Sequence, residues 1–390
     1  MSSFPSSQES SVPRLVLFLA LAVFAMGTSE FMLAGVLPAL ATDLSVAPSA
    51  AGSLVSAFAA GMVLGAPATA ALARRWPPRA ALLGFLAVFA AAHVVGALTA
   101  SLPVLLGTRV VAAFANAGFL AVAFTVAAAA VGPERRARAL SLLLAGTTVA
   151  MVAGVPAGAL VGAAAGWRAL FWSVAALCVP PFLAILAAGP IDPGGGERPS
   201  LRAELVALRA GRTASLLVLT ALVNAGTFGA LTFLAVPVEE VLSAGWIPLV
   251  LMLFGAGACA GVALVGRVAD ASPWALLVVC APLLLSAWTA LAVGGGDAIV
   301  LPVIVPVAGL LAFAVGGTLI TLAIGSAADR APTMAGSYAT AALNVGAVAG
   351  PVGAGVALDR FGGIAGPAGF AAVVVAAAIT GGAVLRRPRA

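Results

Sequence analysis

Long apolar runs separated by short polar breaks fill the chain from residue 15 almost to its end. Each run is close to the ~20 residues that a helix needs to cross ~30 Å of hydrocarbon. In lipid, a run this apolar must satisfy its backbone hydrogen bonds within itself, and a helix does so. We therefore predict an all-α membrane protein with twelve transmembrane helices. They are expected at residues 15–38, 49–72, 80–101, 103–131, 140–165, 168–189, 214–238, 246–268, 274–293, 298–326, 333–357 and 364–385.

One polar gap is much longer than the others and separates six runs from the next six. It covers residues 190–213 and opens with Pro-Ile-Asp-Pro-Gly-Gly-Gly. We interpret it as a cytoplasmic linker. The expected domains are an N-terminal six-helix half, residues 1–189, and a C-terminal six-helix half, residues 214–390.

The two halves share landmarks at one constant offset. Arg74 and Asp270 each follow the second run of their half, and they lie 196 positions apart. Gly154 and Gly350 lie in the fifth run of each half and are also 196 apart. Chance agreement in a glycine-rich chain is the alternative. A duplicated unit predicts two six-helix pseudo-repeats around a central cavity, an arrangement typical of secondary transporters.

Composition and charge agree with a membrane location. The chain is 63% hydrophobic and 8% charged, whereas soluble domains carry about 25% charged residues. The net charge of +6 comes from arginines scattered over short loops, so a nucleic-acid partner is not indicated. The first run is too long for a signal peptide, and we expect it to be retained as a span.

The arginines predict the orientation. If the N-terminus is cytoplasmic, sixteen of the nineteen arginines fall on the cytoplasmic side. Cytoplasmic loops are enriched in positive charge, so we expect a multi-pass protein of the cell membrane with both termini in the cytoplasm. Arg168 and Arg360 fall outside, and Arg109 lies within a span. The sixteen are Arg14, Arg74, Arg75, Arg79, Arg135, Arg136, Arg138, Arg198, Arg202, Arg209, Arg212, Arg267, Arg330, Arg386, Arg387 and Arg389.

Glu30 is the one acidic residue deep inside an apolar run. A charge at that depth costs about 2.5–3.5 kcal/mol on the insertion scale, so it indicates function. Arg109 on the fourth run is expected at a similar depth and carries the opposite charge. A buried ion pair between them would be a proton-coupling element, and a static bridge between two helices is the alternative. Glu30 is also a candidate substrate-binding residue.

Membrane-depth amides are candidate ligands for a substrate. Asn116 and Asn224 are expected to contact it, whereas Asn344 is expected to join helices, a common role of buried polar groups in membrane proteins. His93 is the only histidine in the chain. We expect it to be tolerated on a peripheral helix, and a proton-shuttle role is the alternative.

Small residues recur at four-residue spacing, which lets helices approach closely. We expect these pairs at the seam between the halves. Pro156 and Pro351 interrupt symmetry-related runs and are expected to bend them at a gate. The glycine pairs are Gly61 and Gly65, Gly154 and Gly158, Gly257 and Gly261, and Gly346 and Gly350.

Enzymatic and cofactor chemistry is not indicated. The sequence has no nucleotide-binding P-loop, no Gly-x-Ser-x-Gly nucleophile motif and no His-Glu-x-x-His zinc-binding motif. Its three cysteines lie in apolar runs and are interpreted as small hydrophobic residues, not as metal ligands. We therefore expect no enzyme activity, no cofactor and no metal.

Together, these motifs resemble the major facilitator superfamily. The stretch Gly27-Thr-Ser-Glu-Phe-Met-Leu-Ala-Gly-Val-Leu-Pro38 is similar to the first helix of its drug/proton antiporter branch. The runs beginning at Arg109, at Gly154 and at Gly166-Trp-Arg are most similar to actinobacterial chloramphenicol-resistance exporters. The resemblance implies export driven by proton entry, with alternating access around the cavity. It also implies protonation at Glu30 and proton coupling at Arg109.

Three residues match the antiporter signature of the family, with one extra residue before the proline: Gly154, Pro156 and Gly158. The resemblance fails in the loop after the second helix, where the family pattern Gly-x-Leu-Ala-Asp-Arg-x-Gly-Arg-Lys is replaced by Ala70-Ala-Leu-Ala-Arg-Arg-Trp-Pro-Pro-Arg79. Arg74 stands at the aspartate position. The second-half copy keeps its acid at Asp270, so we expect the gate to use Asp270 and the cluster Arg74, Arg75 and Arg79 differently.

The sequence leaves three functions open. The first is a proton-coupled drug exporter, with chloramphenicol as the best single substrate, acting as a monomer in the bilayer. The second is an exporter of a sugar, nucleoside or other small metabolite with the same fold. The third is a membrane sensor or scaffold, against which the retained Glu30 and Arg109 argue.

Overall fold

The computed structural model describes residues 14–73, 76–131, 133–189, 211–269, 272–328 and 335–386, and these residues are helical with no strand among them. Eleven of the described helices, counting joined segments, are long and apolar enough to cross a membrane. The twelfth candidate is α6, whose two parts, Arg138–Ala150 and Ala153–Ala165, meet at 41°. The predicted fold class, an all-α membrane protein, is confirmed.

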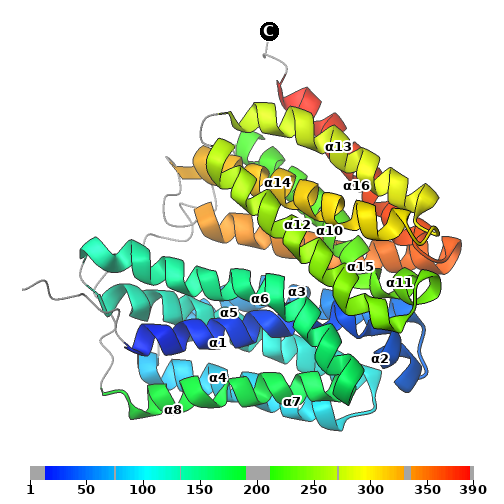
Figure 1. Ribbon diagram of the computed structural model, residues 1–390. Coiled ribbons are helices and arrows are strands. Elements are labelled where there is room, and N and C mark those ends of the chain that lie inside the picture. The colour runs from blue at the N-terminus through cyan, green and yellow to red at the C-terminus, as the bar shows by residue number, and fades with distance from the viewer. Residues whose placement is uncertain are drawn as a thin grey trace, which may run out of the picture.

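The chain forms two helical bundles that lie one above the other in Figure 1, the N-terminal one below. The N-terminal bundle contains α1 (Arg14–Phe31), η1 (Met32–Gly35), α2 (Leu37–Asp43), α3 (Pro48–Ala73), α4 (Pro78–Leu98), α5 (Leu102–Ala129), η2 (Pro133–Arg135), α6 (Arg136–Ala165), α7 (Trp167–Leu177) and α8 (Val179–Ala187). The C-terminal bundle contains α10 (Gly211–Phe233), α11 (Ala235–Val241), η3 (Ala244–Trp246), α12 (Ile247–Val268), α13 (Pro273–Gly294), α14 (Val300–Ala328), α15 (Ala335–Phe361) and α16 (Ala365–Arg386).

Three runs that the sequence predicts as continuous spans are broken. The first divides into α1, η1 and α2, the sixth into α7 and α8, and the seventh into α10 and α11. Pro38, Pro180 and Pro237 each lie in the first turn of the segment after the break. Proline lacks an N–H group and clashes with the preceding turn, so it starts a helix more readily than it continues one.

The glycine pairs lie inside each bundle, so their expected place at the seam between the halves is wrong. Gly61 and Gly65 face α5, and Gly154 and Gly158 face α1 and η1. In the C-terminal bundle, Gly257 and Gly261 face α14, whereas Gly346 and Gly350 face α10. These glycines let backbones meet where a side chain would collide, so each half is closely packed within itself.

The glycine contacts also repeat between the halves. Gly257 follows Gly61 by 196 positions, and Gly261 follows Gly65 by the same 196. In each half this pair joins the second helix to the fourth, α3 to α5 and then α12 to α14. The contacts of Gly154 with α1 and of Gly350 with α10 are equivalent in the same way. The six-helix units are therefore pseudo-repeats in their packing as well as in their sequence.

Contacts between the bundles gather toward the end of the molecule that carries α2 and α11, at the right in Figure 1, which we name the closed end. There α3 packs on α15, and the Ser56 hydroxyl donates a hydrogen bond to the Val348 carbonyl over 2.9 Å. Near the start of α3, Gly52 approaches the ring of Phe233 from the other half. Phe233 belongs to the same buried cluster as the core of the N-terminal bundle.

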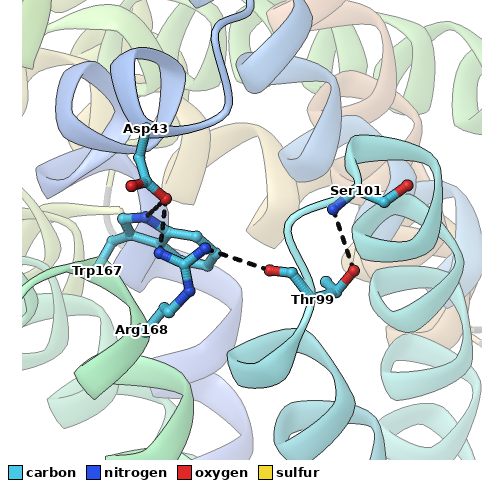
Figure 2. Close-up of polar contacts among 5 residues, drawn as sticks. All are labelled: Asp43, Thr99, Ser101, Trp167 and Arg168. Atoms are coloured by element: carbon cyan, nitrogen blue, oxygen red, sulfur yellow. Dashed lines mark hydrogen bonds and ion pairs between the residues drawn. The ribbon is translucent and has the colours of Figure 1, made fainter.

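A polar cluster holds three elements of the N-terminal bundle together at the closed end (Figure 2). Asp43, the last residue of α2, accepts hydrogen bonds from Arg168 Nη1 at 2.6 Å and from Trp167 Nε1 at 3.1 Å. Arg168 also donates to the Thr99 carbonyl beyond α4 and stacks its guanidinium on the Trp167 ring. Gly166, at φ +79°, makes the turn between α6 and α7 that brings Trp167 and Arg168 here.

We predict that Gly350→Ala destabilises the protein, whereas Gly316→Ala does not. A Cβ at Gly350 would lie 2.9 Å from the Gly229 nitrogen and 3.1 Å from the Ala225 carbonyl carbon. Such overpacking typically costs about 1–3 kcal/mol. A Cβ at Gly316, inside α14, would meet nothing within 4 Å. The thermal midpoints of the two purified variants in the same detergent and at the same heating rate test this, and equal midpoints would contradict it.

A second prediction concerns pH at the closed end. Hydrogen bonds from Arg168 and then from Trp167 lower the pKa of Asp43 below its ordinary value of 3.8. A lowered folded-state pKa stabilises the fold above the unfolded pKa, and this contribution disappears as the pH falls through the folded pKa. The difference in thermal midpoint between wild type and Asp43→Asn should therefore be constant from about pH 7 to about pH 5, shrink below that, and vanish only when the pH is below the lowered folded-state pKa of Asp43.

Arg168→Gln provides the control for the Asp43 prediction. It removes the partner that contributes most to the lowered pKa of Asp43. The loss in thermal midpoint of this variant relative to wild type should therefore show the same pH dependence. The double variant should be no less stable than the worse of the two single variants. Additive losses, or a deficit in thermal midpoint that stays constant as the pH falls well below 3.8, would contradict the assigned pairing.

Candidate functional site

A buried arginine on α5 is the centre of the polar network inside the N-terminal bundle. Arg109 is 1% exposed. Its Nη1 donates to the Ser29 hydroxyl at 2.7 Å, and its Nη2 donates to the Ser29 carbonyl at 2.8 Å. The guanidinium lies 4.3 Å from the centre of the Phe58 ring on α3. A buried charge is tolerated only when it is paired or hydrogen-bonded, and Arg109 satisfies this through the last turn of α1.

The position of Ser29 explains why its carbonyl is available. The last four carbonyls of an α-helix have no partner within the helix, and α1 ends at Phe31. A cationic side chain at this end also interacts favourably with the helix dipole. Arg109 therefore caps the broken end of α1 as well as carrying a charge into the bundle.

His93 extends this network onto α4. Its Nδ1 lies 2.8 Å from the Phe89 carbonyl, and its Nε2 lies 2.7 Å from the Ser29 hydroxyl. A carbonyl only accepts, so Nδ1 carries a hydrogen, and in the neutral imidazole Nε2 accepts from Ser29. The chain of donors then runs from Arg109 through the Ser29 hydroxyl to His93. We expected a peripheral, tolerated histidine, but the structure places His93 in the same network as Arg109.

Glu30 lies beside this network without joining it. It is partly buried, and the charges of Glu30 and Arg109 act on each other. No direct ion pair joins them, because among the described residues the salt bridge is the one between Arg168 and Asp43. The hypothesis of a direct Glu30–Arg109 ion pair is therefore wrong for this conformation. The neighbouring Ser29 occupies both terminal nitrogens of the arginine.

An aromatic pocket lies on the other side of α1, between the two bundles. Successive helix residues point 100° apart, so Phe31 projects away from Ser29, and its ring lies 5.9 Å from that of Phe228 on α10. Phe254 on α12 and Phe313 on α14 add a second ring pair at 6.3 Å. The pocket is apolar, and its volume of about 10 Å³ leaves room for roughly one water molecule. It is closed by side chains from both halves.

The three membrane-depth amides bond to protein groups. Asn116 is buried, and its Nδ2 lies 3.5 Å from Met62 Sδ on α3. Asn224 is partly buried and donates to the Leu343 carbonyl on α15 at 2.6 Å. Asn344, expected to join helices, donates to the Thr340 carbonyl of its own helix at 3.0 Å. The substrate-binding roles of Asn116 and Asn224 stay predictions.

Comparison with known proteins decides the family. A model of the Major Facilitator Superfamily matches residues 19–351. The chain belongs to the major facilitator superfamily. Proteins of this superfamily carry small molecules across membranes, so the chain is a multi-pass membrane transporter, and the resemblance read from the sequence is confirmed.

Two relatives are similar to the chain over most of its length. It is 53% identical over 375 residues to the "Chloramphenicol resistance protein" of Streptomyces lividans, covering 94% of this chain and 95% of that protein. It is 34% identical to the uncharacterised transporter YtbD of Bacillus subtilis, covering 70% of this chain and 69% of YtbD.

The solved structures share the fold at low identity. An inward-facing, unoccupied bacterial homologue of the human lysosomal transporter Spinster matches with TM-score 0.76 and 16% identity, covering 96% of each chain. The nucleoside transporter NupG matches with TM-score 0.77 and 11% identity, covering 97% of this chain and 100% of that one.

The structure describes some, but not all, of the residues that the superfamily motifs place at the gate. Arg79 donates through Nε to the Ile185 carbonyl at 3.3 Å and through Nη2 to the Leu186 carbonyl, so it caps the end of α8 within its own half. Arg74, Arg75 and Asp270 lie outside the described residues. Pro156 lies in the second part of the bent α6 and Pro351 lies inside α15. The gating roles stay predictions.

Sequence reasoning missed Ser29 and the four phenylalanines of the pocket. Serine and phenylalanine are common in membrane helices, so composition does not mark them. The neighbours Ser29 and Phe31 flank Glu30 directly. A helical wheel of this turn, combined with the expectation that Arg109 needs acceptors, is the signal that points to Ser29.

We predict that Ser29→Ala lowers the stability of the protein by about 1.5–3 kcal/mol, the range for a hydrogen bond to a charged group. The substitution removes the hydroxyl that joins Arg109 to His93 and leaves buried donors without partners. Thr28→Ala is the matched control, because the Thr28 hydroxyl bonds only the Phe24 carbonyl of its own helix. Thermal midpoints measure both variants.

A double variant tests whether the network acts as a unit. If Ser29 and His93 are coupled, Ser29→Ala combined with His93→Phe should cost less than the sum of the single losses, by about 0.5–3 kcal/mol. Strict additivity, or a Ser29→Ala midpoint equal to that of Thr28→Ala, would contradict the network.

Proposed function

We propose that this chain exports chloramphenicol, or a related phenicol antibiotic, across the cell membrane in exchange for protons and so confers resistance. The observation that carries this proposal is the 53% identity to the streptomycete chloramphenicol resistance protein over 94% of the chain. Identity at that level over nearly the whole chain includes both bundles and therefore any site between them. The site geometry supplies the physical elements that such an exporter needs.

Glu30 is the proposed proton carrier. It is partly exposed and makes no hydrogen bond to another described residue, so it can exchange a proton without breaking a network. Arg109 is the proposed fixed partner. Its positive charge is held in place by Ser29 and Phe58, and it attracts Glu30 when the carboxylate is charged and releases it when the carboxylate is neutral.

The aromatic pocket is the proposed site for the ring of the substrate once the halves separate, because in this conformation its volume is only about 10 Å³. Phenylalanine rings prefer offset or edge-on contacts with another ring, and four of them converge here from both halves. Because Phe31 follows Glu30 directly, the pocket and the proton carrier share one turn of α1. Asn224, on the same helix as Phe228, is the nearer proposed polar ligand, and Asn116 would first have to leave Met62.

The closed end is proposed to face the cell exterior. The arginine distribution supports this orientation, because it puts both termini in the cytoplasm. In this conformation the halves, residues 1–189 and 214–390 joined by the linker 190–213, are packed together on the outer side. We propose that the monomer alternates access by rocking these halves. Its gate includes Arg74, Arg75, Arg79 and Asp270, and its hinges include Gly154, Pro156, Gly158, Gly350 and Pro351.

A second candidate function is export of a nucleoside, sugar or other small metabolite. The same four rings would stack on a nucleobase or on the apolar face of a sugar. The proton-coupling elements would act in the same way, so the two functions differ in substrate and not in mechanism.

We predict that expression in a pump-deficient bacterium lowers chloramphenicol accumulation, and that a protonophore restores it to the level of empty cells. Glu30→Gln should fold and insert but lose this effect, because a neutral amide cannot carry the proton. The measurement is the accumulation of labelled chloramphenicol with and without protonophore, normalised to the amount of protein in the membrane.

Glu240→Gln is the matched control. It makes the same chemical change on α11, at an exposed position outside the pocket, and should export normally. Equal accumulation in expressing and empty cells would exclude phenicol export, and a panel of nucleosides and sugars would then test the second candidate. Normal export by Glu30→Gln would remove the proposed role of the carboxylate while leaving the substrate assignment in place.

A further inference from the structure

A second, larger cavity lies within the C-terminal bundle, away from the aromatic pocket. Its volume is about 240 Å³, and its lining is contributed by α10, α13, α14 and α16. Leu219, Val223, Leu319 and Val375 form a buried floor. Among the lining residues the rim is exposed at Val278, Pro282 and Ala383. The groove therefore opens between α13 and α16.

The groove faces the membrane and not the other half. In Figure 1, α13 and α16 are the helices farthest from the N-terminal bundle. A surface there, in a chain whose helices cross the bilayer, is in contact with hydrocarbon. Its walls are almost entirely apolar, so water gains nothing by entering. A lipid acyl chain matches both the surroundings and the lining of such a groove.

A positive charge flanks one mouth of the groove, at the end away from the closed end. Arg212 is exposed and lies seven residues before Leu219 on α10, which puts it on the same helix face about 10 Å beyond the floor. The helix α16 ends at Arg386, one turn after Ala383. Trp274, near the start of α13, lines the groove at this level. Tryptophan is enriched where membrane meets water, at the depth of lipid headgroups.

We propose that this groove binds an anionic phospholipid of the cytoplasmic leaflet, with one acyl chain between α13 and α16 and the headgroup phosphate at Arg212. The leaflet follows from the orientation proposed above, whereas the binding does not depend on the transported substrate. The bound chain would pack against the backs of α10 and α14, whose other faces carry Phe228 and Phe313 of the aromatic pocket.

The test is native mass spectrometry of the purified full chain, delipidated and titrated with phosphatidylglycerol or with phosphatidylcholine of the same acyl chains. Each arginine near a charged lipid surface contributes about fivefold in affinity. Wild type should therefore retain one phosphatidylglycerol at a concentration about fivefold lower than that needed for phosphatidylcholine. Arg212→Gln should weaken phosphatidylglycerol binding about fivefold and leave phosphatidylcholine binding unchanged.

Two further variants separate the groove from general lipid adhesion. Gly382→Leu should fill the groove and abolish the retained lipid, since a Cβ there meets only Leu219 at an ordinary 3.7 Å. Gly369→Leu on the same helix points into open space and should bind like wild type. Arg267→Gln removes an exposed arginine at the end of α12, which does not line the groove, and should also bind like wild type.

Equal retention of the two lipids by wild type would overturn the proposal, as would wild-type binding in Arg212→Gln. Unchanged binding in Gly382→Leu would show that the retained lipid lies elsewhere on the surface. None of these outcomes depends on chloramphenicol transport, so a failure of the proposed export function leaves the lipid site open to the same test.

Discussion

The burial of one guanidinium determines the architecture of the N-terminal half. A charge at membrane depth costs about 2.5–3.5 kcal/mol on the insertion scale, and Arg109 is 1% exposed. Its cost is offset by Ser29, which supplies both a hydroxyl and a carbonyl from the last turn of α1. The carbonyl is available because the helix ends there, and the helix end in turn gains a cationic cap. The break in the first helix and the buried charge therefore stabilise each other, and together they determine where Glu30 and Phe31 point.

Glycine contacts pack the helices closely within each half. Gly154 and Gly158 bring α6 against α1 and η1, so the broken helix end is held by α6 as well as by Arg109. The same type of contact recurs 196 positions later, where Gly350 meets α10. Between the halves, α3 packs closely on α15, α6 packs on α12, and Phe31 meets Phe228. Phe233 of the C-terminal half is buried in the core of the N-terminal bundle. A rocking motion of the halves would therefore have to open this shared core.

Much of the fold is predictable from hydropathy, but the direction of side chains within the site is not. The apolar runs, their number and the repeat offset follow from residue type and spacing. The three breaks differ from the continuous spans that hydropathy predicts, although a proline lies in the first turn after each of them. In contrast, hydropathy does not reveal whether Arg109 meets Ser29 or Glu30. These two residues are successive and point 100° apart, so the partner depends on how α1 is rotated about its axis relative to α5. The place of the glycine pairs, inside each half and not between the halves, likewise depends on which helices become neighbours, a property of the assembled bundle.

The unequal anchoring of the two charges decides which of them responds in the proposed cycle. Arg109 is held by two hydrogen bonds and an aromatic ring, so a change in its surroundings moves it little. Glu30 has no such anchor among the described residues, and the attraction between the two charges disappears when its carboxylate is neutral. Any displacement on protonation therefore appears on α1 at Glu30 and is passed to Phe31, the next residue. Because Phe31 contacts Phe228 across the interface, one turn of α1 joins the proton, the aromatic pocket and the opposite half.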